Sequence, residues 1–277
     1  MPNRASHDDR GYRVCGMWNW THLVHSALES SAMLSQFRYV ARRTEGRARV
    51  LEIGCYVGVS LCTLLTDYFP HGTATALDWF QLGSEDEPEL LGNLPEGSSV
   101  PTHDDLLQAL RENVHHAGVA DRVRLFEGDS KALLPQLLED EGACQYDLVI
   151  VDGSHKAEDV YADALWSWRL LRPGGTMVLD DFEYIPQSRP PPQERPKAGL
   201  VHFLRALQPD EFKVVYVGYR LFLRKAERTP LSPVPLPAPS TVSENSCADP
   251  GSHGNSSVHV QHGDARATSR PMDRAGR

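Results

Sequence analysis

The sequence has 277 residues, of which 40% are hydrophobic, and 28 Lys and Arg against 37 Asp and Glu give a formal net charge of −9. This length suffices for one sizeable core, no apolar run approaches the roughly 18 residues that span a bilayer, and the polar start MPNRASHDDRGYR is unlike a signal peptide. The acidic balance argues against a nucleic-acid partner, because phosphate binding requires a clustered excess of Lys and Arg. We therefore expect a cytoplasmic protein that binds neither membranes nor nucleic acid.

Strand-like and helix-like segments alternate between about residues 11 and 225. Apolar residues between positions 23 and 40 predict a leading helix or two. Short aliphatic or β-branched runs predict strands at 49–54, 73–78, 122–128, 146–153, 176–181, 212–217 and 220–224. Apolar residues at helical spacing predict further helices over 106–114 and 160–171, the second of them stopped by the RPGG of residues 172–175.

This order of elements predicts an α/β fold with helices on both faces of the sheet. We expect a Rossmann-like, doubly wound sheet of seven strands that is mostly parallel. Only Gly218 and Tyr219 separate the last two strands, so these should form a hairpin in which the last strand is antiparallel.

The chain divides by composition into three parts. Residues 1–45 form an N-terminal segment with the leading helices, and residues 46–225 form the single predicted domain. Residues 226–277 contain no Phe, Trp or Tyr and are rich in Pro and Ser. Such a composition buries too little apolar surface to offset the entropy of ordering, so we expect a disordered tail.

The first predicted strand leads into the turn VLEIGCYVGVS, at the edge where such sheets bind ligands. Gly54 and Gly58 allow a tight turn and a close approach of the backbone to a ligand. A glycine pair alone would also serve a nicotinamide cofactor, but Tyr56 replaces the second glycine of the dinucleotide fingerprint G-x-G-x-x-G. The acidic Glu52 before the turn favours a cationic cofactor over a pyrophosphate.

Three carboxylates follow the fourth and fifth predicted strands, namely Asp152, Asp180 and Asp181. Adjacent strands lie about 4.8 Å apart, so these side chains can converge on one point. A hard divalent cation such as Mg²⁺ would relieve their repulsion. The alternative is that Asp180 and Asp181 only form a turn or cap beyond the strand.

The glycine turn resembles motif I of class I S-adenosylmethionine-dependent methyltransferases, in the variant with Tyr at the middle position that catechol O-methyltransferase-like enzymes use. The similarity continues through AGVADRVRLFEGDSKALLPQL, YDLVIVDGSH and LLRPGGTMVLDDF, and so covers about residues 50–182. The combination GDS, DGSH and LDDF is most similar to the metal-dependent macrocin O-methyltransferase-like branch. One position departs from the related enzymes, which often carry Asn where this chain has Asp181.

The resemblance implies roles for the residues at the strand ends. Asp78 would accept the ribose hydroxyls, Asp129 and Ser130 would meet the adenine, and Glu52 and Gly54 would flank the methionine portion. Asp78 could instead cap the next segment, and Ser130 could act as a helix N-cap. The predicted cofactor-binding residues are Glu52, Gly54, Tyr56, Gly58, Ser60, Asp78, Trp79, Asp129, Ser130 and Asp152.

His155 follows Asp152 by three residues, where the resemblance implies a basic group beside the reacting oxygen. A histidine titrates in the range that suits removal of a hydroxyl proton. We therefore predict His155 as the general base of an O-methyltransferase, with Asp152, Asp180 and Asp181 holding the metal ion. A bound metal would assist by lowering the pKa of the hydroxyl.

Two segments are candidate covers for the site, 83–101 and 184–199. The second carries Tyr184, Arg189 and Arg195, which could face an acceptor, although an ordinary surface loop is an equal alternative. The aromatic residues at positions 12, 18 and 20 would cover the acceptor pocket or anchor the leading helix.

The predicted function is thus divalent-metal-assisted O-methylation of a small molecule, either a natural-product sugar or a catechol-like diol. The first alternative is a metal-independent or N-methylating small-molecule methyltransferase of the same fold, and a more distant one is an NAD-dependent oxidoreductase. DGSH replaces the Asn/Asp-Pro-Pro-aromatic loop of nucleic-acid amino-methylating enzymes, which argues against those enzymes. We also consider a homodimer built through the leading helix.

Overall fold

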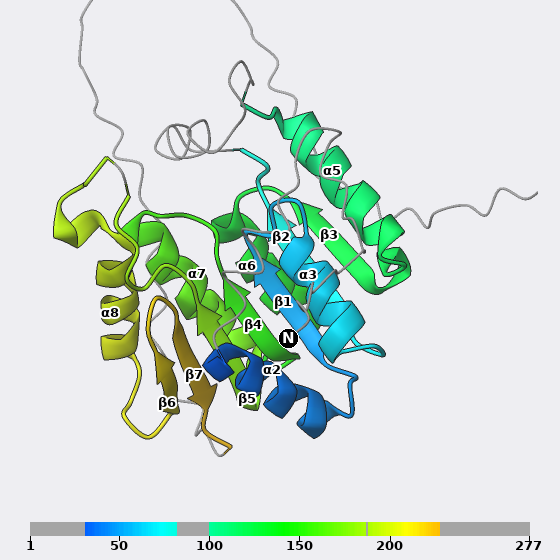
Figure 1. Ribbon diagram of the computed structural model, residues 1–277. Helices are drawn as coiled ribbons and strands as arrows, with labels where there is room; N and C mark the ends of the chain where they lie inside the picture. Colours follow the sequence, from blue (N-terminus) through cyan, green and yellow to red (C-terminus); the bar gives the residue numbers. More distant parts are fainter. Residues whose placement is uncertain (1–30, 82–99, 187, 228–277) are drawn as a thin grey trace, which may run out of the picture. The chain divides into compact units, whose positions relative to one another are not determined.

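The computed structural model describes residues 31–81, 100–186 and 188–227 (Figure 1). Several predictions concern residues outside these ranges. They are the first part of the leading segment, the aromatic residues at positions 12, 18 and 20, most of the acidic segment 83–101, and the tail from residue 228 onward.

A seven-stranded sheet forms the centre of the fold, in the strand order β3-β2-β1-β4-β5-β7-β6. All pairs from β3 to β5 are parallel, whereas β7 pairs antiparallel with both β5 and β6. The predicted seven-stranded, mostly parallel sheet with an antiparallel last strand is therefore confirmed. The strands are β1 (Arg49–Ile53), β2 (Thr73–Asp78), β3 (Val123–Glu127), β4 (Tyr146–Val151), β5 (Leu171–Leu179), β6 (Phe212–Val217) and β7 (Leu221–Lys225).

Helices cover both faces of the sheet, as a doubly wound fold requires (Figure 1). One apolar core packs α2, α3, η1 and α5 on one face, and a second core packs α6, α7 and α8 on the other. The helices are α2 (Ser31–Thr44), α3 (Val59–Thr63), η1 (Leu64–Tyr68), α5 (His103–His116), η2 (Ala120–Arg122), α6 (Ser130–Glu141), α7 (Ala157–Leu170), η3 (Pro192–Glu194) and α8 (Pro196–Ala206).

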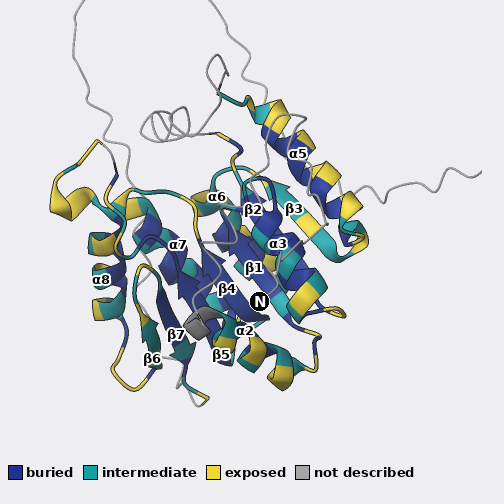
Figure 2. Ribbon diagram, viewed as in Figure 1, coloured by how far each residue is buried: buried dark blue, intermediate teal, exposed yellow. Residues whose placement is uncertain are grey.

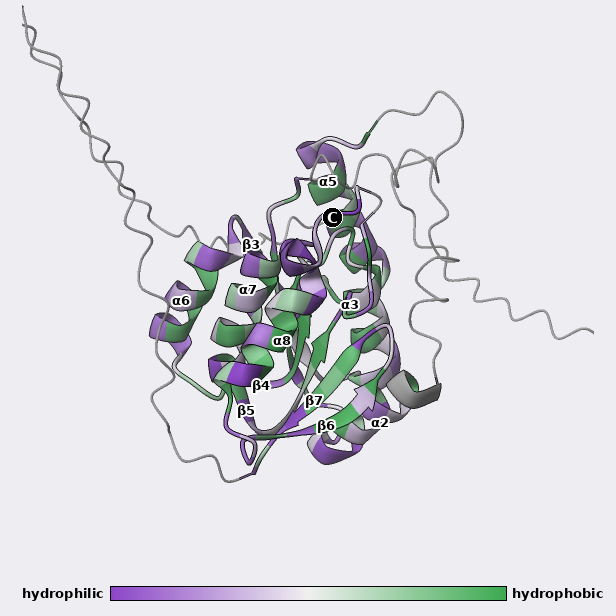
Figure 3. Cartoon of the chain, turned by 90° about the vertical axis from the view of Figure 1, so that its left-hand side faces the viewer, coloured by the Kyte–Doolittle hydropathy of each residue, from purple (hydrophilic) through white to green (hydrophobic). Residues whose placement is uncertain are grey.

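The two predicted central helices form for local reasons that the sequence shows. Helix α5 begins with a capping box in which Thr102 and Asp105 satisfy each other's backbone N–H groups. Helix α7 places Val160, Ala164 and Trp168 in the core, at the spacing that indicated an apolar face. Figure 2 shows the central strands buried between two layers of helices, with the edge strands β3 and β6 less buried, and Figure 3 shows that α6, α7 and α8 mix apolar and polar residues.

The RPGG segment differs from its prediction. Helix α7 ends at Leu170, as the predicted stop requires, but β5 spans Leu171–Leu179 rather than the predicted 176–181, so the segment itself belongs to the strand. The register between β4 and β5 shifts between Tyr146 and Leu148, and Gly174 has a φ of 75°. A bulge of this kind absorbs the extra residues without breaking the pairing.

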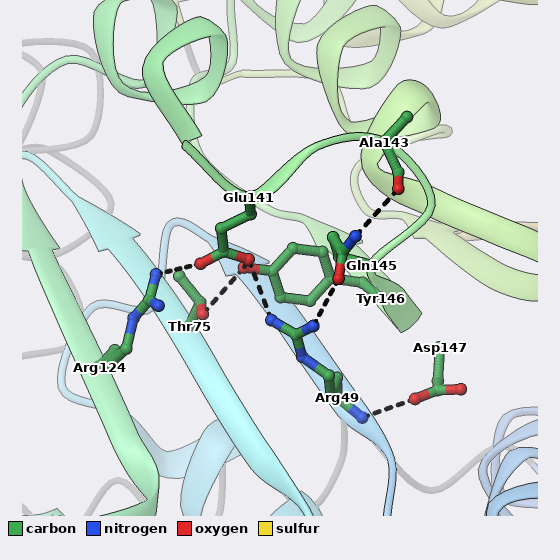
Figure 4. A network of polar contacts seen from close by, with 8 residues as sticks. All are labelled: Arg49, Thr75, Arg124, Glu141, Ala143, Gln145, Tyr146 and Asp147. Atoms are coloured by element: carbon green, nitrogen blue, oxygen red, sulfur yellow. Dashed lines mark hydrogen bonds and ion pairs between the residues drawn. The ribbon is translucent and has the colours of Figure 1, made fainter. Parts of the chain in front are cut away.

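A polar network ties the strands together at the amino end of the sheet, opposite the strand ends that carry the predicted site (Figure 4). The Glu141 carboxylate accepts hydrogen bonds from Arg49 and from the Tyr146 hydroxyl at 3.0 Å each, and it also pairs with Arg124. The Tyr146 hydroxyl is also bonded to Thr75. The network therefore joins β1, β2, β3 and β4 to the end of α6.

The described part of the chain contains no helix that is both long enough and apolar enough to cross a membrane. The homodimer through the leading helix stays a prediction.

Candidate active site

The predicted site residues lie at the carboxyl ends of β1 to β5. The register aligns these ends, because Ile53 pairs with both Leu77 and Val151, and Val151 pairs with Leu179. Residues that follow five strands in the sequence are thereby brought to one edge of the sheet. This is the edge at which doubly wound sheets bind their ligands.

The turn after β1 brings three strands into close contact. The Gly54 N–H donates to the Leu77 carbonyl at 2.9 Å, and the Asp152 N–H donates to the Ile53 carbonyl at 2.8 Å. A Cβ on Gly54 would lie 1.9 Å from the Asp152 carbonyl oxygen, and Gly54 has a φ of 79°. Only glycine fits this position, for reasons of both space and conformation.

Asp78 holds the turn through both of its carboxylate oxygens. One accepts a hydrogen bond from the Tyr56 N–H and the other from the Phe80 N–H, each at 2.6 Å. Tyr56 has a φ of 47°, so the carboxylate supports a backbone conformation that residues with a Cβ rarely adopt. Burial raises the pKa of Asp78, although the two N–H donors act in the opposite direction. The alternative capping role is therefore present, and Trp79 beside it is exposed.

Glu52 is a buried acid directly before the turn. The Ser60 hydroxyl donates to its Oε1, whereas its Oε2 has no hydrogen-bond partner within the described part of the chain. Burial raises the pKa of Glu52 to about 7, and the nearby Asp78 and Asp180 charges act in the same direction. A buried carboxylate oxygen without a partner is costly unless a ligand completes it.

The start of α6 corrects one prediction. Asp129, rather than Ser130, is the N-cap, and its carboxylate accepts a hydrogen bond from the Lys131 N–H at 2.9 Å. Ser130 is instead hydrogen-bonded to Asp163 of α7. Asp163 is 1% exposed, and burial raises its pKa to about 7. Asp163 was not predicted, although an Asp on the apolar face of a predicted helix is a usable signal.

Asp163 makes the stability of the fold depend on pH. Its folded-state pKa of about 7 lies above its ordinary value of 3.8, so the folded state holds the proton more tightly and stability falls as pH rises through this window. Asp163→Asn removes the titration and keeps the shape. We expect the free energy of unfolding of Asp163→Asn, minus that of the wild type, to increase by up to about 4 kcal/mol from pH 4 to pH 8. Urea unfolding at several pH values measures this difference, and a constant difference would contradict the prediction.

Asp152, Asp180 and Asp181 come together at the ends of β4 and β5. One carboxylate oxygen from each lies within 4.8 Å of the others. Consecutive residues of a strand point to opposite faces, but β5 ends at Leu179 and Asp181 has a φ of 56°. This left-handed turn breaks the alternation, so Asp180 and Asp181 turn toward the same point.

The electrostatics of the triad reflect crowded like charges. Removal of the Asp152 carboxylate from water by the surrounding protein raises its pKa well above the usual range, and the charges of Asp180 and Asp181 add to this effect. Asp152 nevertheless keeps an exposed surface. Burial also raises the pKa of Asp180, while Arg220 acts in the opposite direction. Asp152 is thus the exposed member of the triad, and Asp180 and Asp181 are buried.

Two residues of the β6–β7 hairpin contact acids of the triad, and neither was predicted as a site residue. The Arg220 Nε lies 2.6 Å from Asp180 Oδ2, and the Tyr219 hydroxyl donates to Asp181 Oδ1 at 2.7 Å. Burial, and then the Asp181 charge, raises the pKa of Tyr219. The loop spans residues 218–220 rather than the predicted two, because β7 begins at Leu221. The only sequence signal was an Arg at the tip of an apolar hairpin.

His155 lies beside the triad. Its Nε2 is 3.1 Å from Asp181 Oδ2, and its ring packs on the Tyr184 ring with centroids 4.7 Å apart. The three residues of segment 184–199 that were predicted to face an acceptor differ in their contacts. Tyr184 reaches the site through His155, whereas the Arg195 Nε donates to the Pro190 carbonyl of its own loop and Arg189 is exposed.

Comparisons with known proteins agree with this architecture. A family model described as "Methyltransferase domain" matches residues 51–182. A catechol O-methyltransferase of Mycobacterium tuberculosis is 29% identical over 133 residues, which cover 48% of this chain and 47% of that protein. A catechol O-methyltransferase of Niastella koreensis is 34% identical over 71 residues, covering 26% of this chain and 31% of that protein. The matches thus span at most about half the length of these relatives.

Solved structures share the fold. The O-methyltransferase TomG from Streptomyces achromogenes, solved with S-adenosylmethionine, has a TM-score of 0.51 and 20% identity, with 80% of this chain and 91% of that chain covered. At this identity the likeness shows the fold alone. Residues 51–182 thus match a methyltransferase domain, and this part of the chain is similar in sequence to catechol O-methyltransferases.

Proposed function

We propose that this protein transfers a methyl group from S-adenosylmethionine to a hydroxyl of a small molecule, with assistance from a divalent metal ion. The observation that carries the proposal is the placement of His155 and three carboxylates beside the glycine turn of β1. A proton acceptor, a cation-binding group and a cofactor turn therefore share one edge of the sheet. We also propose residues 46–225 as the catalytic domain, between the segment 1–45 and the tail 226–277.

The residues at the ends of β1 to β4 fit the cofactor. Gly54 lets β1 and β4 meet closely at the turn, and the buried Glu52 has an oxygen to which a cationic group can bind. Asp78 lies at the end of β2, as a ribose-binding carboxylate would require. The proposed contacts are those predicted from the sequence: Glu52, Gly54, Tyr56, Gly58, Ser60, Asp78, Trp79, Asp129, Ser130 and Asp152.

The triad of Asp152, Asp180 and Asp181 fits a hard divalent cation, and Mg²⁺ is our proposal. Carboxylate oxygens are the ligands that Mg²⁺ prefers, and the three oxygens lie close enough for one ion. When bound, such an ion supplies a positive charge that lowers the pKa of an acceptor hydroxyl. Asp181 contributes a charge where many related enzymes carry a neutral Asn.

His155 would take the proton of the acceptor. The imidazole would accept that proton, and Asp181, whose Oδ2 lies 3.1 Å from Nε2, would stabilise the imidazolium that forms. The acceptor oxygen forms its bond to the methyl carbon as the carbon–sulfur bond breaks. The electron pair of the carbon–sulfur bond stays on sulfur, and S-adenosylhomocysteine is the second product. No covalent enzyme intermediate is therefore required.

The test is a methyl-transfer assay on a panel of sugars and catechol-like diols, with Mg²⁺ and with a chelator. We expect at least one panel member to gain one methyl group, and we expect the chelator to lower its turnover by about tenfold or more. Mass spectrometry of the product measures the transfer. Turnover that is indifferent to the chelator would contradict the metal assignment and favour the metal-independent alternative.

A further inference from the structure

The Arg220 guanidinium is a positive charge beside the carboxylate triad. Its side chain is 13% exposed, and its Nε lies 2.6 Å from Asp180 Oδ2. It interacts electrostatically with Asp180, Asp152 and Asp181, in decreasing order. The three acids therefore already share one cation that belongs to the chain itself.

The hairpin loop fixes the position of this charge. The Gly218 N–H donates to the Arg220 carbonyl at 2.9 Å, which closes the tip of the hairpin. The neighbouring Tyr219 holds Asp181 through its hydroxyl, and its carbonyl accepts from the Glu183 N–H at 3.2 Å. Adjacent loop residues thus hold adjacent acids, so Asp180 and Asp181 have protein partners that keep them in place.

A guanidinium at this position has two opposite effects. It offsets the repulsion among three carboxylates, so the triad can stay assembled without a metal ion. It also repels any other cation that approaches the same oxygens, because two positive charges close together in a partly buried site repel each other strongly. The net charge available to a divalent cation falls from −3 to −2 when Arg220 is counted with the ionised triad.

We propose that Arg220 is a positioning residue that preassembles the carboxylate triad and weakens its affinity for the divalent cation, so that the ion exchanges readily. This inference rests on the proposed function, in which the triad holds such an ion. Arg220 sets how tightly the site holds the metal and how far the fold depends on it. Asp152, whose outer surface is exposed, is then the triad acid that an arriving ion meets first.

The test compares cation binding by the full chain without an acceptor. Arg220→Gln keeps a hydrogen-bond donor for Asp180 but removes the charge, and Arg220→Lys keeps the charge. Titration calorimetry with Mn²⁺ and with Mg²⁺ should show binding at least about tenfold tighter in Arg220→Gln than in the wild type. Arg220→Lys should stay within about threefold of the wild type. Lys197→Gln is the matched control, because Lys197 pairs with Glu183 in an exposed position outside the triad.

A second measurement separates charge from shape. The melting temperature of the wild type should change little between Mg²⁺ and chelator, whereas Arg220→Gln should be less stable in chelator and regain stability in Mg²⁺. Equal cation affinity in the wild type and Arg220→Gln, weaker binding in the variant, or no binding by either protein would overturn the inference. Absence of methyl transfer by the wild type would instead contradict the proposed function, since cation binding is measured without turnover.

Discussion

His155→Ala should lower kcat by about 10²- to 10⁴-fold while the affinity for S-adenosylhomocysteine stays within about twofold of the wild type. The reason is that His155 lies beside Asp181 and Tyr184, next to the proposed metal-binding acids, whereas the proposed cofactor contacts lie mainly in and around the turn after β1. Steady-state turnover on a panel acceptor and calorimetry with S-adenosylhomocysteine measure the two quantities.

His202→Ala is the matched control for this substitution. His202 also stacks on a tyrosine, with its ring centroid 4.5 Å from that of Tyr161, but it lies on the exposed side of α8. We expect it to leave kcat unchanged. Full activity in His155→Ala would remove the general base from the account. A parallel loss of cofactor affinity would show that His155 supports the fold of the site instead.

Gly54→Ala should destabilise the fold by more than about 3 kcal/mol and abolish cofactor binding. The added Cβ would lie 1.9 Å from the Asp152 carbonyl oxygen and 2.6 Å from the Gly153 Cα. Both are backbone atoms, so relief requires β1 and β4 to move apart at the cofactor turn. Urea unfolding gives the loss of stability, and calorimetry with S-adenosylhomocysteine gives the loss of binding.

Gly118→Ala separates the two causes of this loss. Gly118 also has a positive φ, 67°, but a Cβ there would meet no atom within 4 Å. Its substitution should therefore cost only about 1 kcal/mol, the conformational penalty alone, and should leave cofactor binding intact. Losses of similar size in the two variants would contradict the close approach of β1 and β4.

The sequence predicts the parallel part of the fold because its signals are local. Each buried strand is a short aliphatic run, and the helices between them carry their apolar residues at regular spacing. The glycines at 54 and 58 and the acids that end β2, β4 and β5 also occupy predictable places, since parallel strands bring their carboxyl ends to one edge. The placement of Asp78, Asp152 and Asp180 follows from that rule.

The remaining parts depend on contacts between distant segments. Arg220 reaches Asp180 only because β7 inserts between β5 and β6 in the sheet, and the spacing of residues shows nothing of that order. The bond between Ser130 and Asp163 similarly requires α6 and α7 to pack side by side. The RPGG segment stops α7 as predicted, but the strand begins at Leu171 rather than 176 because a bulge keeps Pro and Gly within β5.

The triad and its neighbours form one electrostatic unit. Asp180 binds Arg220, Asp181 binds both Tyr219 and His155, and Asp152 is the exposed member of the triad. A change in any of these groups alters the field at the others, so single substitutions here should be compared in pairs. Comparison of a double variant, for example Arg220→Gln with His155→Ala, with its two single variants shows whether cation affinity and proton transfer are coupled.

Binding of S-adenosylhomocysteine and of NAD to the same preparation tests the central claim most directly. We expect titration calorimetry to show one S-adenosylhomocysteine per chain and no binding of NAD, because the turn after β1 carries Tyr56 in place of a fingerprint glycine and follows the buried Glu52. Asp78→Ala should weaken the S-adenosylhomocysteine affinity by about tenfold or more, since it removes the carboxylate that holds the turn. Binding of NAD without S-adenosylhomocysteine would contradict the account.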